Sequence, residues 1–381
     1  MARQNGSDQK EIRQMKILHV FKDYYPVVGG IENHIKILAE FQAQNGFDVT
    51  VLTTSPDAKT TIENMNSVKV IKASRIAALS STPISISLLK WMHKLDVDIT
   101  HLHFPYPVGE FAHLLFGHSL HTIITYHNDI VKQKILLMLY KPFLLKVFKK
   151  ADCILTTSPQ LIKTSPILSR FSHKCKVVPY GIDISRFGNP DKVISDKLRA
   201  EYNSSPIILF VGRLRYFKGL EYLIDAMKSV NARLLIVGAG SEERTLRAKV
   251  LRERLESRIS FLGEVPNNEL PEYFAASDIF VLPSSHRSES FGIVLIEAMA
   301  SGKAVISTEL GTGTSFVNIH EKTGLVVPPR NPELLARAIN RLLTDDILRQ
   351  KCEVNARKRS GEFSMERLNK RIIKIYKELS D

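Results

Sequence analysis

A short apolar run, a glycine-containing turn and an amphipathic stretch follow one another repeatedly along this 381-residue chain. The first instance joins KILHVF at 16–21, a Pro and Gly-Gly turn, a helix-like segment at 31–46 that ends in Asn-Gly, and FDVTVLTTS at 47–55. Short apolar runs bounded by turn residues are typical of buried strands, and apolar residues at helical spacing are typical of helices. The pattern therefore predicts a βαβ unit of a parallel sheet.

The same pattern restarts in the second half, where PIILFVGRL at 206–214 and ARLLIVGAG at 232–240 are predicted strands. A chain of this length is too long for one ordinary core. We therefore expect an α/β fold with two doubly wound domains in tandem and a ligand-binding cleft between them. The expected parts are a flexible lead-in at 1–14, an N-terminal domain at 15–185, a C-terminal domain at 186–362 and a C-terminal helix at 363–381.

The formal charge of +14 favours anionic partners, which include phosphates, nucleic acid and acidic membrane surfaces. The three cysteines, Cys153, Cys175 and Cys352, are far apart and form no metal-binding pattern with histidines. This usage fits a reduced, cytosolic location. The first residues contain no apolar signal-peptide region, and no apolar run reaches about 18 residues, so no transmembrane helix is expected.

Two carboxylates, Glu289 and Glu297, flank an apolar run that is predicted to be helical. Ser290 or a neighbour can cap a helix that begins near Gly292, and this glycine leaves room for a ligand beside the backbone. The helix dipole and its free N–H groups favour a phosphate at this end. The N–H groups in question belong to Phe291, Gly292, Ile293 and Val294. The alternative is a capped, partly buried helix in which Glu297 has a local partner.

A second basic turn follows the predicted strand that ends at Val211. Arg213 and Lys218 lie between that strand and a helix beginning near Gly219, and two cations at such a turn can bind a diphosphate. A solvated basic loop is the alternative. VGAGSEERTL at 237–246 lacks the third glycine of a dinucleotide fingerprint, because Glu243 occupies its place, so an NAD site is disfavoured.

Together these motifs resemble those of the retaining glycosyltransferases of family 4, which have the GT-B architecture. The resemblance extends from about Lys16 to the C-terminal helix. It implies two Rossmann-like doubly wound domains with a cleft between them. The matching elements are Glu289-SFGIVLI-Glu297-AMASG, Gly212-Arg213-Leu214 with Lys218-Gly219, Gly29-Gly30-Ile31-Glu32, and Pro179-Tyr-Gly181-Ile182-Asp183.

The resemblance also implies a role for each matching residue. Arg213 and Lys218 would bind the diphosphate and stabilise the leaving group, Glu297 would hold the ribose hydroxyls, and Glu289 would contact the donor sugar. The remaining donor contacts would come from the amides of Phe291, Gly292, Ile293 and Val294, from Gly29 and Gly30, and from the backbone of Val265. A lone histidine after a strand is more often structural, but His127 matches a family histidine close to the reacting sugar. His101 and His103 leave an acceptor contact open.

The resemblance implies transfer of a hexose, mannose or a related sugar, from a nucleoside-diphosphate sugar to a saccharide or lipid-linked acceptor in surface-polysaccharide synthesis. GDP-mannose is favoured as the donor, and a UDP-sugar stays open. No D-x-D element serves the usual metal role, so neither a metal nor another cofactor is expected. The alternatives are a sugar-nucleotide epimerase or hydrolase on the same fold, and a non-catalytic basic binding protein.

The segment 131–152 mixes lysines with large apolar residues. Such a helix can lie in an anionic membrane interface, or it can be a core helix with lysines at its rim. We therefore expect a cytoplasmic protein and leave open peripheral attachment to the inner face of the membrane. A nucleic-acid partner is not expected, because the paired glutamates have no use on such a surface.

Overall fold

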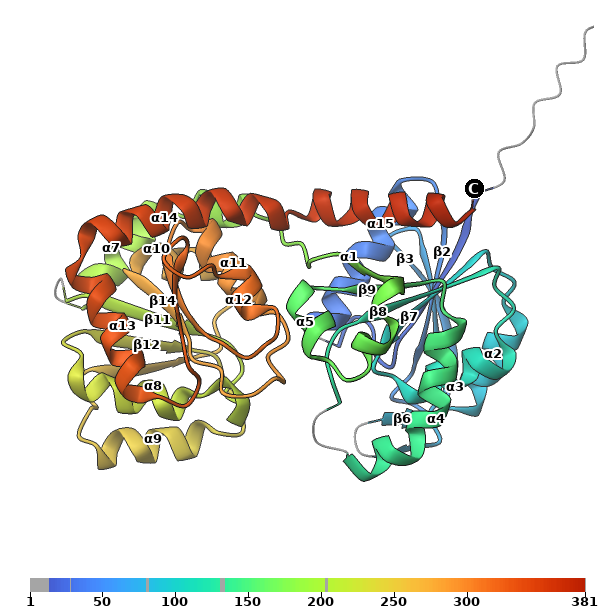
Figure 1. The fold of residues 1–381 in the computed structure, drawn as a ribbon, viewed down its shortest axis with the longest axis horizontal. Coiled ribbons are helices and arrows are strands. Elements are labelled where there is room, and N and C mark those ends of the chain that lie inside the picture. Colours follow the sequence, from blue (N-terminus) through green and yellow to red (C-terminus); the bar gives the residue numbers. More distant parts are fainter. Residues whose placement is uncertain (1–13, 28, 80–81, 131–133, 203–204, 381) are drawn as a thin grey trace, which may run out of the picture. The chain divides into compact units, whose positions relative to one another are not determined.

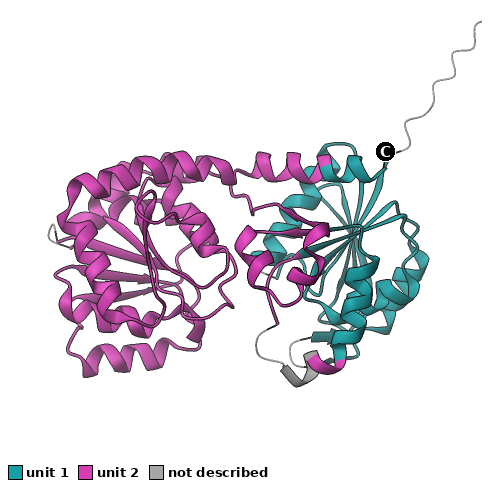
Figure 2. Cartoon of the chain, viewed as in Figure 1, with its two compact units in different colours: residues 1–125, 140–153, 375–381 teal, residues 126–139, 154–374 magenta. Residues whose placement is uncertain are grey.

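The computed structural model describes residues 14–27, 29–79, 82–130, 134–202 and 205–380. These residues form two large sheets surrounded by helices (Figure 1). They also divide into two compact units (Figure 2), the first made of 1–125, 140–153 and 375–381 and the second of 126–139 and 154–374. None of the described helices combines the length and the apolar composition needed to cross a lipid bilayer.

The first sheet has eight strands in the order β10-β9-β8-β7-β1-β2-β4-β3. Its central strands are parallel, since β1 pairs with both β2 and β7, and His19 lies opposite His101 in this register. Among the pairings described for this sheet, only that of β3 with β4 is antiparallel. The strands are β1 (Lys16–Val20), β2 (Asp48–Thr54), β3 (Thr61–Met65), β4 (Val68–Ala73), β7 (Ile99–Phe104), β8 (His121–Tyr126), β9 (Cys153–Thr156) and β10 (Cys175–Val177).

The helices of this half of the chain alternate with its strands. They are α1 (Gly30–Gln44), α2 (Ile86–Lys94), α3 (Pro107–Phe116), α4 (Lys134–Lys150) and α5 (Pro159–Thr164). A short antiparallel hairpin, β5 (Ala77–Leu79) and β6 (Thr82–Ile84), lies outside the main sheet.

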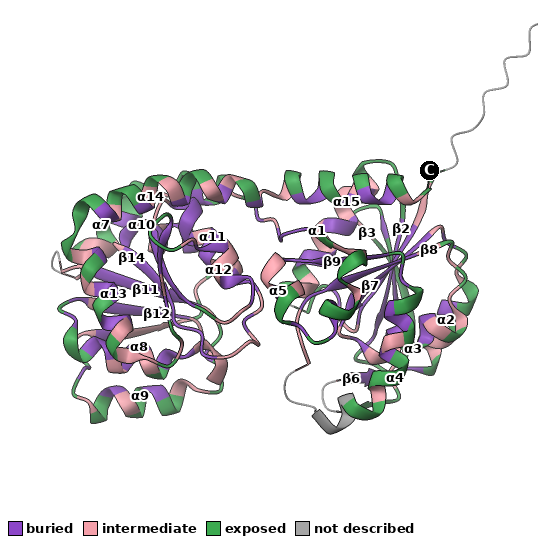
Figure 3. Ribbon diagram, in the orientation of Figure 1, coloured by how far each residue is buried: buried purple, intermediate pink, exposed green. Residues whose placement is uncertain are grey.

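The second sheet has six parallel strands in the order β13-β12-β11-β14-β15-β16, and its central strands are buried along their whole length (Figure 3). The strands are β11 (Ile207–Val211), β12 (Arg233–Val237), β13 (Ile259–Gly263), β14 (Ile279–Leu282), β15 (Ala304–Thr308) and β16 (Gly324–Val327). The helices are α6 (Ser185–Gly188), α7 (Lys192–Ala200), α8 (Leu220–Ala226), α9 (Glu243–Arg252), α10 (Leu270–Ala276), α11 (Ile293–Ala300), α12 (Thr314–Val317), α13 (Pro332–Thr344), α14 (Asp346–Ser360) and α15 (Met365–Ser380).

The predicted α/β class and the predicted parallel sheets are confirmed. The sequence did not predict β3, because TIENM carries no apolar run and nearly all of it is exposed. It also did not predict the β5–β6 hairpin or α14. The predicted domain boundaries stay a prediction, and nearly all of the predicted lead-in at 1–14 lies outside the described residues.

Parallel strands end at the same edge of their sheet, so the loops that follow them are brought together. In the second sheet this edge carries the loops after β11, β12, β14 and β15. The glycine turn after β11, the serine-rich loop after β14 and the helix α11 that follows this loop hold most of the predicted site residues. The candidate site is therefore built on the most buried strands of this unit.

Candidate functional site

Lys218 and Glu289 form the centre of the candidate site. Lys218 Nζ lies 2.6 Å from Glu289 Oε2, and the Oγ of Ser284 donates to the same carboxylate oxygen at 3.0 Å. Their side chains are only 13% and 10% exposed. A partly buried ion pair that shares a further hydrogen bond is held in one geometry. The fold thus holds a cation and a carboxylate side by side. This contact does not follow from the sequence positions of the two residues.

The turn after β11 determines where Lys218 points. Gly219 has a φ of +68°, and a Cβ at this position would lie 2.1 Å from the carbonyl oxygen of Pro283. The chain therefore passes too close to the β14 loop for any other residue. A Cβ on Gly212 would lie 3.6 Å from Lys218 Nζ, so the ammonium lies beside the end of β11. Arg213, the second predicted phosphate ligand, is exposed on the same turn.

Helix α11 begins as the sequence predicted, at Ile293, directly after Gly292. Gly292 is its N-cap with a φ of +76°. Among the residues that the structure describes, no acceptor is recorded for the backbone N–H groups of Phe291, Gly292, Ile293 or Val294. Four such donors at a helix N-terminus favour an anionic ligand.

The predicted capping by Ser290 is wrong, since no side chain caps α11. The Oγ of Ser290 instead donates to the backbone oxygen of His127. The serine is drawn away from the helix because the loop after β8 lies against the loop after β14 in this unit.

Glu297 lies one turn inside α11 and is partly exposed. Burial raises its pKa to about 7, and the positive charges of Arg186 and Lys218 oppose this shift. The side chain has no hydrogen-bond partner among the described residues, so the local partner considered for it is not found there. A carboxylate in a poorly solvated place without a partner is costly, which favours a ligand that donates hydrogen bonds to it.

His127 lies at the end of β8, where it is buried. Its Nδ1 forms a hydrogen bond with the hydroxyl of Tyr180, and the two rings stack with centroids 5.7 Å apart. Tyr180 in turn contacts the edge of Phe291, 5.3 Å between centroids. Stacked aromatic contacts of this kind fix ring orientation. His127 is therefore linked through Tyr180 to the residue that opens the N-terminus of α11.

The other predicted donor contacts lie further along the chain. Val265 is partly buried in the loop after β13. Gly29 and Gly30 belong to the first unit, where Gly29 caps α1 and a Cβ on Gly30 would meet no atom within 4 Å. The roles predicted for these three residues stay predictions.

Sequence reasoning missed several residues that support this site. Ser284 and Thr312 bind Glu289, the second through the carbonyl oxygen at 2.8 Å, and Tyr180 orients His127. Ser284 lies two residues after the buried strand β14, and Tyr180 lies inside the Pro179–Asp183 motif, so the sequence carried a signal for both. Thr312 carried none, because its contact depends on how the loop after β15 folds back.

One group of buried histidines, His19, His101 and His103 of the first unit, has ring nitrogens within 4.8 Å of one another. These nitrogens are already engaged: His19 binds His103 at 3.0 Å and Gln42 at 2.7 Å, whereas His101 binds Tyr376 at 2.5 Å and Thr125 at 2.6 Å. The rings of His101 and His103 stack rather than converge. A metal ion would break these bonds, so we interpret the group as a polar core network.

This network lies in the interior of its unit, where all three histidines are at most 1% exposed. Burial lowers the pKa of His19 to about 4. The neutral ring of His19 is therefore favoured at physiological pH. The acceptor contact that the sequence left open for His101 and His103 is not supported by this placement, since both side chains are enclosed.

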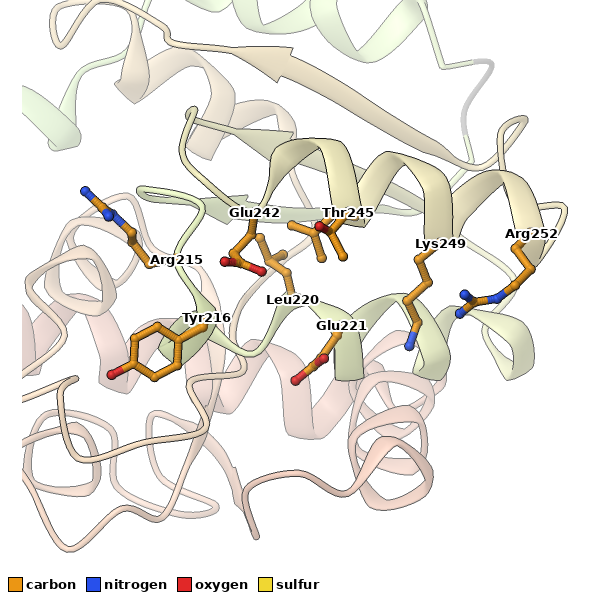
Figure 4. Close-up of a pocket in the computed structure, with 9 residues that line it drawn as sticks. Arg215, Tyr216, Leu220, Glu221, Glu242, Thr245, Lys249 and Arg252 are labelled. Carbon is orange, nitrogen blue, oxygen red and sulfur yellow. The ribbon is translucent and has the colours of Figure 1, made fainter. Parts of the chain in front are cut away.

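A separate hollow of about 210 Å³ lies between the segment that begins α8 and helix α9 (Figure 4). It is lined by Arg215, Tyr216, Leu220, Glu221, Glu242, Thr245, Leu246, Lys249 and Arg252. Both signs of charge are present, and none of the predicted site residues lines it. We assign it no role in the candidate site.

Two family models match this chain. The model described as "Glycosyltransferase Family 4" matches residues 28–186, and the one described as "Glycosyl transferases group 1" matches residues 194–359. The two matches together span most of the chain and include every predicted site residue.

Curated relatives match over most of their length. The chain is 37% identical to D-rhamnosyltransferase WbpZ of Pseudomonas aeruginosa, over 85% of this chain and 86% of that protein. It is 34% identical to O-antigen chain mannosyltransferase C of Escherichia coli, over 96% of this chain and 99% of that protein. Among solved structures, sucrose-phosphate synthase from Thermosynechococcus elongatus aligns with a TM-score of 0.79 at 24% identity. The alignment covers 96% of this chain and 99% of that protein. That likeness shows the fold.

Proposed function

This chain belongs to the glycosyltransferases of family 4, and from that premise we propose that it moves a hexose from a nucleoside-diphosphate sugar to a saccharide or lipid-linked acceptor with retention of anomeric configuration. The single observation that carries the proposal is the Lys218–Glu289 pair at the N-terminus of α11. It places a cation for a diphosphate beside a carboxylate for a sugar.

The diphosphate is the first part of the donor that this site would bind. The ammonium of Lys218 lies beside the end of β11, and Arg213 is exposed on the same turn. Four backbone N–H groups at the N-terminus of α11 have no recorded acceptor among the described residues. Cations and amide dipoles that converge on one point stabilise phosphate oxygens. In the reaction the same groups stabilise the charge that develops as the bond to the anomeric carbon breaks.

The two glutamates would bind the hydroxyl groups of the donor. Glu297 offers a carboxylate without a described partner, which suits the two hydroxyls of a ribose. Glu289 is held by Lys218 and Ser284 through one oxygen, Oε2, and its other oxygen is recorded in no hydrogen bond with a described residue. That oxygen would accept from a hydroxyl of the transferred sugar. The two carboxylates would thereby bind separate parts of one ligand, Glu297 the ribose and Glu289 the transferred sugar.

The sugar and the acceptor are proposed from the relatives. One is named an O-antigen chain mannosyltransferase and matches over nearly its whole length. The other is named a rhamnosyltransferase, whose sugar is also a hexose derivative. We therefore favour mannose or a related hexose, GDP-mannose as its donor, and a growing cell-surface polysaccharide as acceptor, with a UDP-sugar as the competing donor.

We propose that the reaction proceeds without a divalent cation. Arg213, Lys218 and the N-terminus of α11 supply the positive charge that the leaving diphosphate requires. Activity in the presence of EDTA should equal activity without it. Loss of activity in EDTA that Mn²⁺ restores would overturn this part of the proposal.

We propose further that the protein works at the cytoplasmic face of a membrane. Helix α4 buries Leu144, Val147 and Phe148 and exposes Lys141 and Phe143. Phe143 packs against Phe111 of α3, which is also exposed. Apolar side chains next to lysines suit an anionic lipid surface. Residues 131–133 of the predicted amphipathic segment lie outside the described residues.

The test is a transfer assay with purified protein, GDP-mannose or UDP-glucose, and lipid-linked saccharide acceptors, read by mass spectrometry. The expected result is a product one hexose larger from GDP-mannose, with the donor's anomeric configuration by NMR. Turnover of the donor with no acceptor present would instead indicate an epimerase or hydrolase. Tight, salt-sensitive binding to polyanions without any turnover would indicate a binding protein.

A further inference from the structure

We propose that Arg287 is a positioning residue that holds the loop of His127 against the loop of Glu289. The inference rests on the proposed function, because it concerns the same site. Arg287 lies two residues before Glu289, and its partner Asp129 lies two residues after His127.

The guanidinium of Arg287 joins three segments of the second unit. Its Nη2 lies 2.8 Å from Asp129 Oδ2 and donates to Thr164 Oγ1 at 3.0 Å. Its Nη1 donates to the backbone oxygen of Gly311 at 3.1 Å. Thr164 Oγ1 also donates to Gly311 O at 2.6 Å, which joins the last residue of α5 to the loop after β15. A planar fork can bind three partners at once, which a lysine ammonium does with less geometric control.

Asp129 is fixed from its other side. Its Oδ1 accepts from the hydroxyl of Tyr126 at 2.6 Å and from Ser165 Oγ at 2.6 Å. Both carboxylate oxygens are thus engaged, and the side chain is 14% exposed. Charge-assisted bonds of a mostly buried carboxylate are stronger than those of an exposed pair. Asp129 is therefore held in place by Tyr126 and Ser165, and its bond to Arg287 restrains the loop that carries Arg287.

A second bond joins the same two loops. Ser290, three residues after Arg287, donates through its Oγ to the backbone oxygen of His127. The Arg287–Asp129 and Ser290–His127 contacts therefore lie on either side of the segment that contains Glu289. With both contacts in place, the backbone at His127 and the backbone at Glu289 are set relative to each other within this unit.

The contacts of Arg287 argue for positioning rather than for donor binding. Both terminal nitrogens already bind protein groups, and the side chain is 32% exposed. Lys218 and Arg213 lie on a different turn. Small misplacements of groups that act together can cost about 100-fold in rate. Loss of Arg287 should therefore impair the chemical step and leave the affinity for the nucleotide intact.

The first test compares Arg287→Ala with the wild-type full-length chain in the transfer assay and in calorimetric titration with the nucleoside diphosphate. We expect kcat to fall by about 10- to 100-fold while KM for the donor and Kd for the nucleotide change by less than about twofold. Arg287→Lys should recover part of the lost kcat. Arg337→Ala removes an arginine from an exposed ion pair on α13 of the same unit and should change none of these values.

A double-mutant cycle tests the proposed partner. Asp129→Asn keeps an oxygen for Tyr126 and Ser165 but removes the charge that Arg287 binds. If the two residues act as a pair, Arg287→Ala combined with Asp129→Asn is no slower than the slower single variant. Multiplicative losses in the double variant would overturn the pairing.

A measurement independent of turnover follows the His127 ring. In histidine-labelled protein, the NMR signal that disappears in His127→Gln identifies this residue. We expect that signal to shift in Arg287→Ala and to stay unchanged in Arg337→Ala. An unchanged His127 signal, an unchanged kcat, or a loss of nucleotide affinity in proportion to kcat would each overturn the inference. If wild type transfers no sugar, the proposed function fails, and the NMR result still decides whether Arg287 positions His127.

Discussion

At the scale of single residues, the ion pair of Lys218 and Glu289 joins positions 71 residues apart in sequence. Removing the lysine takes away a cation aimed at the leaving diphosphate, so Lys218→Ala should lower kcat by about 10²- to 10³-fold. Thermal unfolding and circular dichroism should show that the variant is folded. Lys228→Ala, which breaks a surface pair with Glu253, is the matched control and should retain full activity. Normal turnover by Lys218→Ala would contradict the phosphate assignment.

Glu297 gives a pH dependence whose sign can be worked out. Its pKa is raised in the folded protein to about 7, above the ordinary value, so the folded state favours the protonated form. The resulting stabilisation is present at acidic pH and is lost as the pH rises through about 7. Glu297→Gln cannot lose a proton. The melting temperature of Glu297→Gln minus that of wild type should therefore increase between about pH 5 and pH 8.

Ionisation of Glu297, which lowers the stability of the folded protein, should raise its affinity for the nucleotide. Ribose hydroxyls donate to a carboxylate, so the ionised form of Glu297 is the better acceptor. Nucleotide affinity of wild type should rise as the pH passes 7, and that of Glu297→Gln should stay nearly constant. Equal pH profiles for the two proteins would remove Glu297 from the donor site.

At the scale of secondary-structure elements, the turn between β11 and α8 depends on one glycine. Gly219→Ala would place a Cβ 2.1 Å from Pro283 O on a backbone with a φ of +68°. We expect it to lower the free energy of unfolding by about 1–3 kcal/mol. Gly361→Ala is the control, because a Cβ there meets no atom within 4 Å and its φ is −58°. That variant should stay within about 0.5 kcal/mol of wild type in urea unfolding.

Helix α11 shows how an element can be predicted correctly while its cap is not. Its apolar run and Gly292 indicated where it begins, and the structure agrees. The sequence favoured Ser290 as the cap because serine is a common N-cap residue. The hydroxyl instead binds His127, a residue 163 positions away. Among the residues that the structure describes, no acceptor is recorded for the donors at the N-terminus of α11, and such donors are what an anion-binding site requires.

At the scale of the whole molecule, the end of the chain is part of the core of the first unit. Tyr376 of α15 accepts from Gln42 Nε2 at 3.2 Å and contacts His101 Nδ1 at 2.5 Å. Tyr376→Phe leaves buried polar groups unpaired and should cost about 1–3 kcal/mol of stability. Denaturant unfolding measures the loss. Tyr25→Phe, at an exposed position of the same unit, should have almost no effect, and an equal cost in the two variants would show that the network contributes nothing.

The basic surface of α4 allows a test of membrane attachment. The exposed lysines Lys141, Lys146 and Lys149 should each contribute about 1 kcal/mol to binding anionic lipid. Replacing all three with Glu should lower co-sedimentation with vesicles of anionic phospholipid by at least tenfold. Binding to zwitterionic vesicles should stay weak for both proteins.

The matched control reverses three exposed charges elsewhere. Lys322→Glu, Arg337→Glu and Lys358→Glu change the net charge by the same amount in the second unit. If the control loses as much binding as the α4 variant, attraction depends on overall charge and α4 is not a docking surface.

Much of the candidate site could be predicted from the sequence. Glu289, Gly292 and Glu297 lie close together in the sequence after one buried strand, and Lys218 lies in the turn after another, so each of these two segments could be predicted from local sequence. The alternation of strands and helices determined the fold class for the same reason, because periodicity is a property of neighbouring residues.

Only the tertiary structure decided the contacts between segments that are distant in the sequence. The spacing of Glu289 and Lys218 does not reveal that they touch, Ser290 gives no sign that it binds the backbone of His127, and Asp129 and Arg287 carry no pattern that pairs them. The sequence left an acceptor contact open for His101 and His103, and only the fold shows that both are buried and that His101 binds Tyr376 and Thr125. Local sequence determines backbone conformation through sterics and periodicity, whereas hydrogen-bond partners are set by the loops that packing brings together.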